Sequence, residues 1–298
     1  MKPIHRLLIN SMPKSGTHLL ILVVELLGYQ DHGRHDSLWR KAQDRLGLSA
    51  PMVLAHQRVQ RNWKRRWLCA VRDNNNRRTI PMDVVLPVRV PVDLANQWLN
   101  DIAPGCYLPG HLPWTETTAH LVQAAQLKHL LIVRDPRDVL VSFVHYVTRP
   151  EHLLSADFLS LSPDQRLILA TEGGQGPHSG RQIVGLRQGF ASILDWRREP
   201  DVLLVRFESL IGERGHGSSI AQRHAVREIC QFLNLPHDNS LIEHICQRAF
   251  DTGSATFRRG KIGSWQDELS PDQIQRCTES FTQILDQLAE LPAGPTAD

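Results

Sequence analysis

Residues 6–28 decide the fold and read RLLINSMPKSGTHLLILVVELLG. Within them, residues 6–10 form a short apolar run of strand length, SMPKSG at 11–16 has a loop composition, and residues 17–28 are rich in Leu and Val. Because apolar side chains occur on all sides of the last segment, we expect a helix buried against a sheet rather than one with a solvent-facing face. The stretch therefore predicts a strand, a turn and a buried helix in succession.

The same alternation recurs further along the chain. The apolar run HLLIV at 129–133 precedes a predicted helix at 138–146, and VLLVRF at 202–207 is a third candidate for a buried strand. Short apolar strands that alternate with helices are typical of a mostly parallel sheet with helices on both faces. Near the C-terminus, Ser270 and Pro271 stand where the N-cap and the first turn of a final helix are expected. We therefore predict an α/β fold.

Length and composition limit the class of protein. The chain has 298 residues, of which 41% are hydrophobic, which is enough for a packed core and too many for a disordered chain. This length fits a single domain over residues 1–298, in which residues 31–105 form a variable insert. The longest apolar stretch, 19–27, contains Glu25 and is much shorter than the roughly 20 residues of a membrane-spanning helix. We expect neither a transmembrane segment nor a signal peptide.

Charge and cysteine content exclude further classes. Lys and Arg number 34 against 31 Asp and Glu, and the net charge of +3 is too small to favour nucleic acid as a partner. The five cysteines are scattered without a CxxC pair, and no HExxH or clustered Cys/His set occurs, so no metal is implied and a cytoplasmic location is expected. The cysteines are Cys69, Cys106, Cys230, Cys246 and Cys277.

Three stretches between the predicted elements have loop-like or basic composition. Residues 172–180 (EGGQGPHSG) and 212–219 (GERGHGSS) are expected to be Gly-rich loops. The insert carries a basic region at 58–78, in which the spacing of Val59, Trp63, Trp67 and Val71 fits either an amphipathic helix or a hairpin strand. This region either lines the entrance to a binding site or packs on the domain with its charges in water.

The first candidate site is PKSGTH at 13–18, between the first predicted strand and helix. Backbone N–H groups and the positive end of a helix dipole converge on such a turn, and Gly16 lets the backbone approach an anion closely. Lys14 adds a full charge, and Ser15 and Thr17 add hydroxyl donors. The segment is not a Walker A loop, because no GxxxxGK[ST] occurs in the chain. The alternative is a Ser-capped helix with a surface Lys.

The second candidate is RDPRDVLVS, which begins at Arg134 directly after HLLIV. An Arg at the carboxyl end of a buried strand stands where open α/β sheets bind ligands, and its guanidinium can hold a phosphate through two hydrogen bonds. If the helix begins near Asp138, Ser142 lies about one turn in and can face the same crevice. The alternative is a structural Arg134 paired with Asp135 or Asp138.

The third candidate is FRRGKIGSW at 257–265. Three cations in four positions, two glycines and flanking aromatic rings suit an anion clamp. Taken alone, such a run is also typical of a solvated surface loop.

The three candidates together resemble the nucleotide-binding segments of the sulfotransferase family that uses 3′-phosphoadenosine 5′-phosphosulfate (PAPS). That family has a PKSGTT loop, an RxxxDxxxS segment and an RKGxxGDW segment, which stand here in the same order as PKSGTH, RDPRDVLVS and RRGKIGSW. A fourth stretch, GHLP at 110–113, is similar to the family's THLP, which carries the catalytic histidine. The resemblance covers residues 6–29, 107–147 and 202–281, and it implies a P-loop-NTPase-like parallel sheet.

The resemblance also implies a role for each matching residue. His111 would be the general base that takes the proton of the acceptor hydroxyl, and Lys14 would stabilise charge on the leaving nucleotide. The 5′-phosphosulfate would be held by Lys14, Ser15, Gly16, Thr17 and His18. The 3′-phosphate would be held by Arg134, Ser142, Arg258, Arg259 and Gly260. No metal is required, because fixed cations meet the leaving group.

The chain departs from the family pattern at several positions. The substituted positions are His18 for the second loop threonine, Leu19 for the adenine-stacking tryptophan, Phe207 for the tyrosine after the third strand, and Ser264 for the aspartate of the last segment. Residues 249–251 (AFD) are similar to the family's Ser-Phe-Glu, which would make Phe250 the remaining ring on adenine. No copy of the family's KxxxTVxxxE dimer motif is found, so the sequence does not indicate an oligomeric state.

The resemblance implies a PAPS-dependent sulfotransferase that acts on a hydroxyl, or an amine, of a small molecule, lipid or glycan. Residues 31–105 would then lie on the acceptor side of the domain. Two alternatives remain: a nucleotide kinase of the same broad fold, and a degenerate member that binds nucleotide without catalysis. The absent Walker A lysine argues against the kinase.

Overall fold

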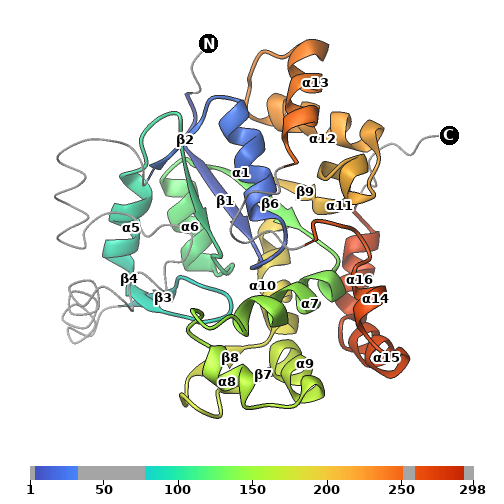
Figure 1. Cartoon of the computed structure of the whole chain (residues 1–298). Coiled ribbons are helices and arrows are strands. Elements are labelled where there is room, and N and C mark those ends of the chain that lie inside the picture. Colours follow the sequence, from blue (N-terminus) through green and yellow to red (C-terminus); the bar gives the residue numbers. More distant parts are fainter. Residues whose placement is uncertain (1–3, 33–77, 251–258, 292–298) are drawn as a thin grey trace.

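The computed structural model describes residues 4–32, 78–250 and 259–291, and at its centre lies a five-stranded sheet (Figure 1). The strand order is β2-β5-β1-β6-β9, and every neighbouring pair is parallel. The predicted α/β fold with a parallel sheet is therefore confirmed. The strands are β1 (Leu7–Ser11), β2 (Gln30–Asp31), β5 (Cys106–Gly110), β6 (Lys128–Val133) and β9 (Val202–Arg206).

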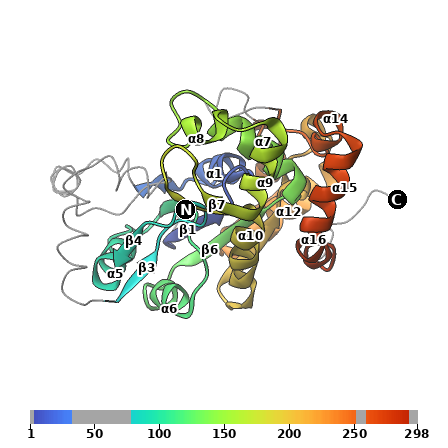
Figure 2. The ribbon, with the colours of Figure 1, turned by 90° about the horizontal axis from the view of Figure 1, so that it is seen from below.

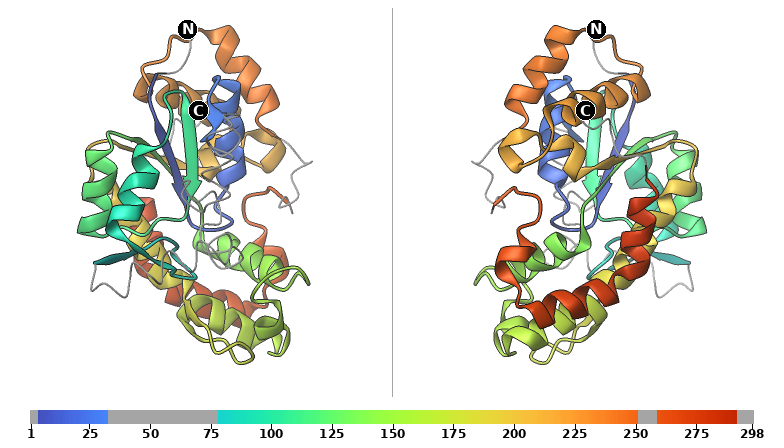
Figure 3. Two further views of the ribbon diagram at one scale, coloured as in Figure 1. Left: turned by 90° about the vertical axis from the view of Figure 1, so that its left-hand side faces the viewer. Right: turned by 90° about the vertical axis from the view of Figure 1, so that its right-hand side faces the viewer.

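Helices cover both faces of this sheet because successive side chains of each strand point to opposite faces. Leu7 and Ile9 pack with one hydrophobic cluster, whereas Leu8 between them packs with the other. The first cluster is completed by α1 (Thr17–Leu26), α12 (Ser219–Phe232) and α13 (Asn239–Arg248). The second includes α5 (Val92–Asn100), α6 (Glu116–Ala124), α7 (Pro136–Val147) and α10 (Leu186–Leu194). Figure 3 shows the sheet between α1 on one side and α5 and α6 on the other.

The predicted elements occur with small shifts at their ends. The helix expected at 17–28 ends at Leu26, and the strand expected at 202–207 ends at Arg206 because Phe207 begins the short helix α11 (Phe207–Leu210). The helix expected at 138–146 begins two residues earlier, at Pro136. Asp135 caps it, since the carboxylate accepts a hydrogen bond from the backbone N–H of Arg137 at 2.8 Å.

The Gly-rich stretch 172–180 is not only a loop, and this corrects the prediction. Strand β7 (Gly173–Gln175) pairs antiparallel with β8 (Gln182–Val184), so the stretch contains one strand of a hairpin. Asp157, which is buried in α8 (Ser155–Leu159), holds the hairpin turn. Its carboxylate accepts hydrogen bonds from the N–H of His178 (2.8 Å), the N–H of Ser179 (2.7 Å) and the Ser179 hydroxyl (2.7 Å). This clamp joins distant parts of the chain, so local sequence does not reveal it.

The C-terminal helix predicted at Ser270 and Pro271 begins there, but it is not the final helix of the chain. Ser270 caps α15 (Pro271–Ser280) and forms a capping box with Gln273. Helices α14 (Trp265–Glu268) and α16 (Thr282–Ala289) flank it. The second predicted loop, 212–219, holds the short 3-10 helix η3 (Glu213–Gly215) before α12 begins at Ser219. Another 3-10 helix, η2 (Asp195–Arg198), follows α10.

Part of the predicted insert 31–105 is described. Residues 78–105 contain the antiparallel pair β3 (Thr79–Pro81) and β4 (Arg89–Pro91), followed by α5. Residues 33–77, which include Trp63, Trp67 and nearly all of the basic region, lie outside the described residues, so the choice between an amphipathic helix and a hairpin strand is not tested. Within the described ranges, no helix is long and apolar enough to cross a membrane.

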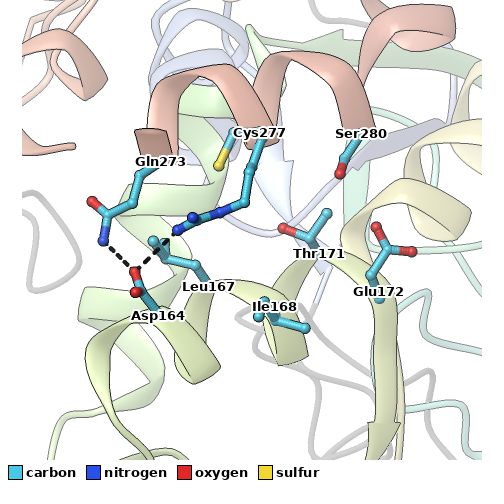
Figure 4. A pocket seen from close by; sticks show the side chains of 9 residues that line it. Asp164, Leu167, Ile168, Thr171, Glu172, Gln273, Cys277 and Ser280 are labelled. Atoms are coloured by element: carbon cyan, nitrogen blue, oxygen red, sulfur yellow. Dashed lines mark hydrogen bonds and ion pairs between the residues drawn. The ribbon is translucent and has the colours of Figure 1, made fainter. Parts of the chain in front are cut away.

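A groove separates α9 (Pro163–Glu172) from α15, and these helices lie side by side (Figures 2 and 4). Leu167, Ile168 and Cys277 contribute its apolar lining. At one end Asp164 accepts a hydrogen bond from Gln273 at 2.6 Å and pairs with Arg276 at 3.3 Å. Because these polar groups already bind one another, the groove is best understood as helix packing, and none of its lining residues is a predicted site residue.

Candidate functional site

Several of the predicted site residues lie where the parallel strands end. The loop at 12–16 follows β1, His111 follows β5 and Arg134 follows β6. Because these strands are neighbours and run in the same direction, their carboxyl ends meet at one edge of the sheet. The connection after β1 runs to β2 on one side of the sheet, whereas the connection after β6 runs to β9 on the other, so the carboxyl ends of β1 and β6 form the switch point at which open α/β sheets bind ligands.

The loop after β1 has a backbone suited to an anion. Lys14 and Gly16 both have left-handed conformations, with φ of +71° and +101°. Gly16 is the N-cap of α1 and no side chain caps this end, so the alternative of a Ser-capped helix is wrong. The hydroxyl of Ser15 is buried and has no hydrogen-bond partner among the described residues. Open backbone N–H groups at a helix N-terminus and an unsatisfied buried hydroxyl are features that a bound phosphate or sulfate would satisfy.

Lys14 lies over an aromatic ring. Its Nζ stands 4.8 Å from the centroid of Tyr146, in the last turn of α7. A ring face stabilises an ammonium group while leaving its charge available. Tyr146 is a site residue that sequence reasoning missed. The sequence gives no local sign of it, because only the fold brings α7 beside the loop.

His111 is buried, and its hydrogen bonds determine which ring nitrogen carries the proton. Nδ1 lies 2.8 Å from the carbonyl oxygen of Ser11. A carbonyl can only accept, so Nδ1 donates and the neutral ring has its lone pair on Nε2. The Ser11 hydroxyl lies 3.3 Å from the same nitrogen and 2.6 Å from the hydroxyl of Thr17. Nε2 is therefore the atom that can accept a proton from a substrate.

His18 stands in the first turn of α1, near Lys14 and His111. Desolvation by the surrounding atoms lowers its pKa, and the charges of Lys14 and His111 lower it further, whereas Glu25 raises it. The neutral form of His18 is therefore favoured near neutral pH. A neutral imidazole can donate a hydrogen bond to an anion, but it adds no full charge to the loop.

Arg134 is nearly buried and is held on three sides. Its guanidinium lies 4.2 Å from the ring centroid of Phe207, donates to the carbonyl of Lys261 at 2.7 Å and pairs with Asp138 at 3.3 Å. The alternative prediction, in which Arg134 pairs with Asp135 or Asp138, is therefore confirmed for Asp138. Asp135 binds Arg137 instead, at 2.7 Å.

Asp138 links this part of the site to the C-terminal segment. Its carboxylate accepts hydrogen bonds from the backbone N–H of Gly263 at 2.9 Å and of Trp265 at 3.2 Å. Sequence reasoning treated Asp138 only as a partner for Arg134 and missed this second role. Ser142, which is also buried, lies about two turns into α7 rather than one, because the helix begins at Pro136.

The C-terminal segment itself is described from residue 259 onward, so Arg258 lies outside the described residues. Arg259 is exposed and pairs with Asp267 and Glu268 at 3.4 and 3.5 Å. Gly260 has φ of +58°. The N–H of Ile262 donates to the carbonyl of Gly215 at 3.0 Å, so the loop before α12 also binds the segment. The residue of this segment that contacts Arg134 is Lys261, through its carbonyl oxygen.

Phe250, the predicted adenine ring, packs against the hydrophobic cluster of α1, α12 and α13 as a partly buried side chain. Among the described residues, no group of three or more His, Cys, Asp or Glu side chains could hold a metal ion.

Comparison with known proteins identifies the family of the chain. The family model of the sulfotransferase domain matches residues 5–289. The chain belongs to the sulfotransferase family. The solved structures of this family's members extend the likeness to the fold. Mouse sulfotransferase SULT7A1, crystallised with PAP, is 18% identical with a TM-score of 0.56, over 94% of this chain and 84% of that one. Retinol dehydratase, in complex with androsterone and the inactive cofactor PAP, is 14% identical with a TM-score of 0.54, over 98% and 83%.

The similarity to one curated relative covers a smaller part of both chains. Sulfotransferase 6B1 of Danio rerio is 24% identical over 170 residues, which are 52% of this sulfotransferase-family chain and 50% of that protein. The aligned region therefore spans about half the length of this relative.

Proposed function

We propose that the chain transfers a sulfuryl group from PAPS to a hydroxyl, or an amine, of an acceptor molecule. The observation that carries the proposal is the position of His111, whose Nδ1 donates to Ser11 and whose Nε2 lone pair stands at the same sheet edge as Lys14. Family membership supports it, and so do the relatives crystallised with PAP.

The residues present fit the donor. The unsatisfied hydroxyl of Ser15, the left-handed turn at Lys14 and Gly16 and the N-terminus of α1 would hold its phosphosulfate end together with Thr17 and His18. Arg134, Ser142 and the segment of Arg258, Arg259 and Gly260 would hold the 3′-phosphate, and Phe250 stays a predicted adenine contact. PAPS supplies an activated sulfuryl group.

The transfer step follows from these positions. Nε2 of His111 accepts the proton of the acceptor hydroxyl while that oxygen forms a bond to sulfur. The bond from sulfur to the bridging oxygen breaks, its electron pair stays on the phosphate oxygen, and PAP leaves. Lys14 stabilises the negative charge that develops on this oxygen. Fixed positions and fixed charges thus supply catalysis, as in phosphoryl transfer.

The acceptor is proposed only as a class. Retinol dehydratase is crystallised with androsterone, a small hydroxylated molecule, which supports a small-molecule hydroxyl here, and a lipid or a glycan stays a prediction. The cytoplasmic location and the single domain stay predictions from composition and length.

The test is the variant His111→Ala, with His120→Ala as the matched control. His120 is exposed on α6 and belongs to no part of the site. Loss of the general base is expected to lower kcat for a hydroxyl acceptor by about 10²–10⁴-fold while adenosine 3′,5′-bisphosphate still binds. The control should transfer at the wild-type rate. Transfer that survives in His111→Ala with nucleotide bound would show that His111 is not the base.

Activity with ATP and Mg²⁺ in place of PAPS would support the kinase alternative. Binding of the bisphosphate without transfer to any acceptor in a panel of phenols, alcohols and amines would support a degenerate member.

A further inference from the structure

Asn10 follows three apolar residues in β1, which ends at Ser11, and its polar side chain is completely buried. A buried amide is unfavourable unless its donor and acceptor atoms find partners. Here the partners are not in the helices that cover the sheet. They belong to the main chain directly after His111.

The amide of Asn10 binds Leu112 in both directions. Oδ1 accepts from the N–H of Leu112 at 2.8 Å and from the N–H of Ser11 at 3.0 Å, and Nδ2 donates to the carbonyl of Leu112 at 2.9 Å. The amide orientation is fixed by chemistry, since a backbone N–H can meet only the oxygen and a carbonyl only the nitrogen. The side chain therefore adds one rung to the β1–β5 ladder after its last backbone pair, Asn10 and Gly110.

A second donor reaches the same carbonyl. Nε1 of Trp196, which is fully buried in η2, lies 2.8 Å from the Leu112 oxygen. Leu112 is thus held by three hydrogen bonds from two side chains. Its main chain is fixed although it lies beyond the end of β5.

His111 lies between two fixed points as a result. Gly110 before it belongs to the strand ladder, and Leu112 after it is bound by Asn10. The imidazole then reaches the carbonyl of Ser11, the neighbour of Asn10 in β1. Asn10 and Ser11 of β1 therefore bind the main chain after His111 and the ring of His111, beside the contact of Trp196 with Leu112 and an isolated β-bridge between Asp83 and His111.

We propose that Asn10 is a positioning residue for sulfuryl transfer: its amide holds the His111–Leu112 backbone so that Nδ1 meets Ser11 and Nε2 faces the acceptor. This inference rests on the proposed function of His111 as the base. Asn10 itself touches neither reactant. A displacement of about 1 Å at a reacting group can cost about 10²-fold in rate, which is the scale of the expected effect.

The first experiment does not depend on activity. The ¹⁵N chemical shifts of the His111 ring report which nitrogen is protonated, in the full-length wild type and in Asn10→Ala. We expect Nδ1–H in the wild type and a mixture of both tautomers in the variant. An unchanged tautomer in a folded Asn10→Ala would overturn the proposal, whatever reaction the protein catalyses.

The second experiment separates positioning from general damage by comparing acceptors. A phenol that is already ionised at the assay pH needs no base, whereas an aliphatic alcohol does. Asn10→Ala is expected to lose about 10²-fold in kcat with the alcohol and less than about 10-fold with the ionised phenol. Equal losses with both acceptors would contradict the proposal.

A double-mutant cycle completes the test. Adding Asn10→Ala to His111→Ala should lower kcat by no more than about 2-fold further, because the group that Asn10 positions is already gone. The same loss in both backgrounds would show that Asn10 acts independently of His111. If the wild type transfers no sulfuryl group, the proposed function fails, and the ring shifts still decide the role of Asn10.

Two further variants guard against a folding defect. Asn10→Asp keeps the size and the accepting oxygen but removes the donor to Leu112, and it replaces Asn10→Ala if that variant does not fold. Gln222→Leu is the matched control, since Gln222 is also a buried amide that donates to a main-chain carbonyl, that of Leu210 at 3.1 Å. It should lower stability without changing the His111 tautomer.

Discussion

At the scale of single residues, the loop after β1 depends on a backbone conformation that few side chains tolerate. Gly16 combines a left-handed φ with close packing, because a Cβ built there would lie 2.5 Å from Cδ2 of Phe207. The Phe207 ring in turn lies beneath the guanidinium of Arg134, at 4.2 Å. A side chain at position 16 would therefore disturb both the conformation of the loop and the position of the Arg134 guanidinium.

The substitution Gly16→Ala tests this coupling against Gly180→Ala. Gly180 is also left-handed, with φ of +66°, but a Cβ there meets nothing within 4 Å. The control should show only the backbone cost of about 1–2 kcal/mol in the free energy of unfolding, measured in urea. Gly16→Ala adds the clash with Phe207 and should be the less stable variant.

Nucleotide binding distinguishes the same two variants. Displacing Phe207 moves Arg134, so Gly16→Ala should weaken binding of adenosine 3′,5′-bisphosphate about 10-fold or more, an amount equal to about 1.4 kcal/mol. Gly180→Ala should bind as the wild type does. Equal stability and equal affinity in both variants would mean that the packing of Gly16 has no part in the site.

At the scale of elements, strand β6 contains a histidine among aliphatic residues. His129 is fully buried, neither ring nitrogen has a hydrogen-bond partner in the described structure, and its ring meets Trp196 edge to face at 4.7 Å. Burial lowers the pKa of His129 to about 3. The imidazole is therefore neutral in the folded protein and behaves as a packing group.

This burial makes stability depend on pH. Between the folded pKa of about 3 and the unfolded value of 6.5, only the unfolded chain binds the proton, so stability is complete above pH 6.5 and is lost as pH falls. Below pH 6.5, the titration of His129 lowers the free energy of unfolding by up to about 1.4 kcal/mol per pH unit. The total decrease at pH 5 is about 2 kcal/mol.

Urea unfolding of the wild type and of His129→Leu at pH 7 and pH 5 measures the effect. The leucine variant should lose about 2 kcal/mol less than the wild type between these values. It should equal or exceed the wild type at pH 7, because an apolar group replaces two unsatisfied nitrogens. The same pH dependence in both proteins would mean that His129 does not titrate as its burial implies.

The elements also show what the sequence could and could not reveal. Strands β1, β6 and β9 are continuous apolar runs and were predictable from that pattern. Strand β5 reads CYLPG, with Pro and Gly at its end, and only its pairing with β1 makes it a strand. The hairpin at β7 depends on Asp157 in the same way. The pattern of apolar residues within one segment predicts that the segment is buried. A strand or turn that depends on a hydrogen-bond partner elsewhere in the chain has no such pattern of its own.

The candidate site also contains residues that the sequence predicts and residues that it does not. The glycine, the lysine and the arginine at strand ends were predictable because strand ends of parallel sheets hold ligands. The residues that orient these side chains were not predictable from the sequence. Asn10 binds a residue 102 positions away, and Asp138 binds one 125 positions away.

At the scale of the whole molecule, the proposed nucleotide site joins the two ends of the described chain. The loop at Lys14 and Gly16 lies at the N-terminal end, whereas Gly263 and Trp265 belong to the C-terminal segment. Within the described structure, the middle region contacts both: Tyr146 of α7 lies under Lys14, and Asp138 and Arg134 form hydrogen bonds with Gly263, Trp265 and Lys261. A ligand that touches both ends should therefore stabilise them together.

Hydrogen exchange with adenosine 3′,5′-bisphosphate tests this expectation, beside adenosine 5′-monophosphate and ATP with Mg²⁺. At about 100 times its Kd, the bisphosphate should stabilise the fold by about 2.7 kcal/mol. It should slow exchange at residues 15–18 and also at Gly263 and Trp265, whereas the monophosphate, which lacks the 3′-phosphate, should protect only the loop after β1. Protection confined to that loop with every ligand would exclude the C-terminal segment from the site. Stronger protection by ATP and Mg²⁺ than by the bisphosphate would favour a kinase, because a site built for a 3′-phosphate leaves Arg134 without a matching group on ATP.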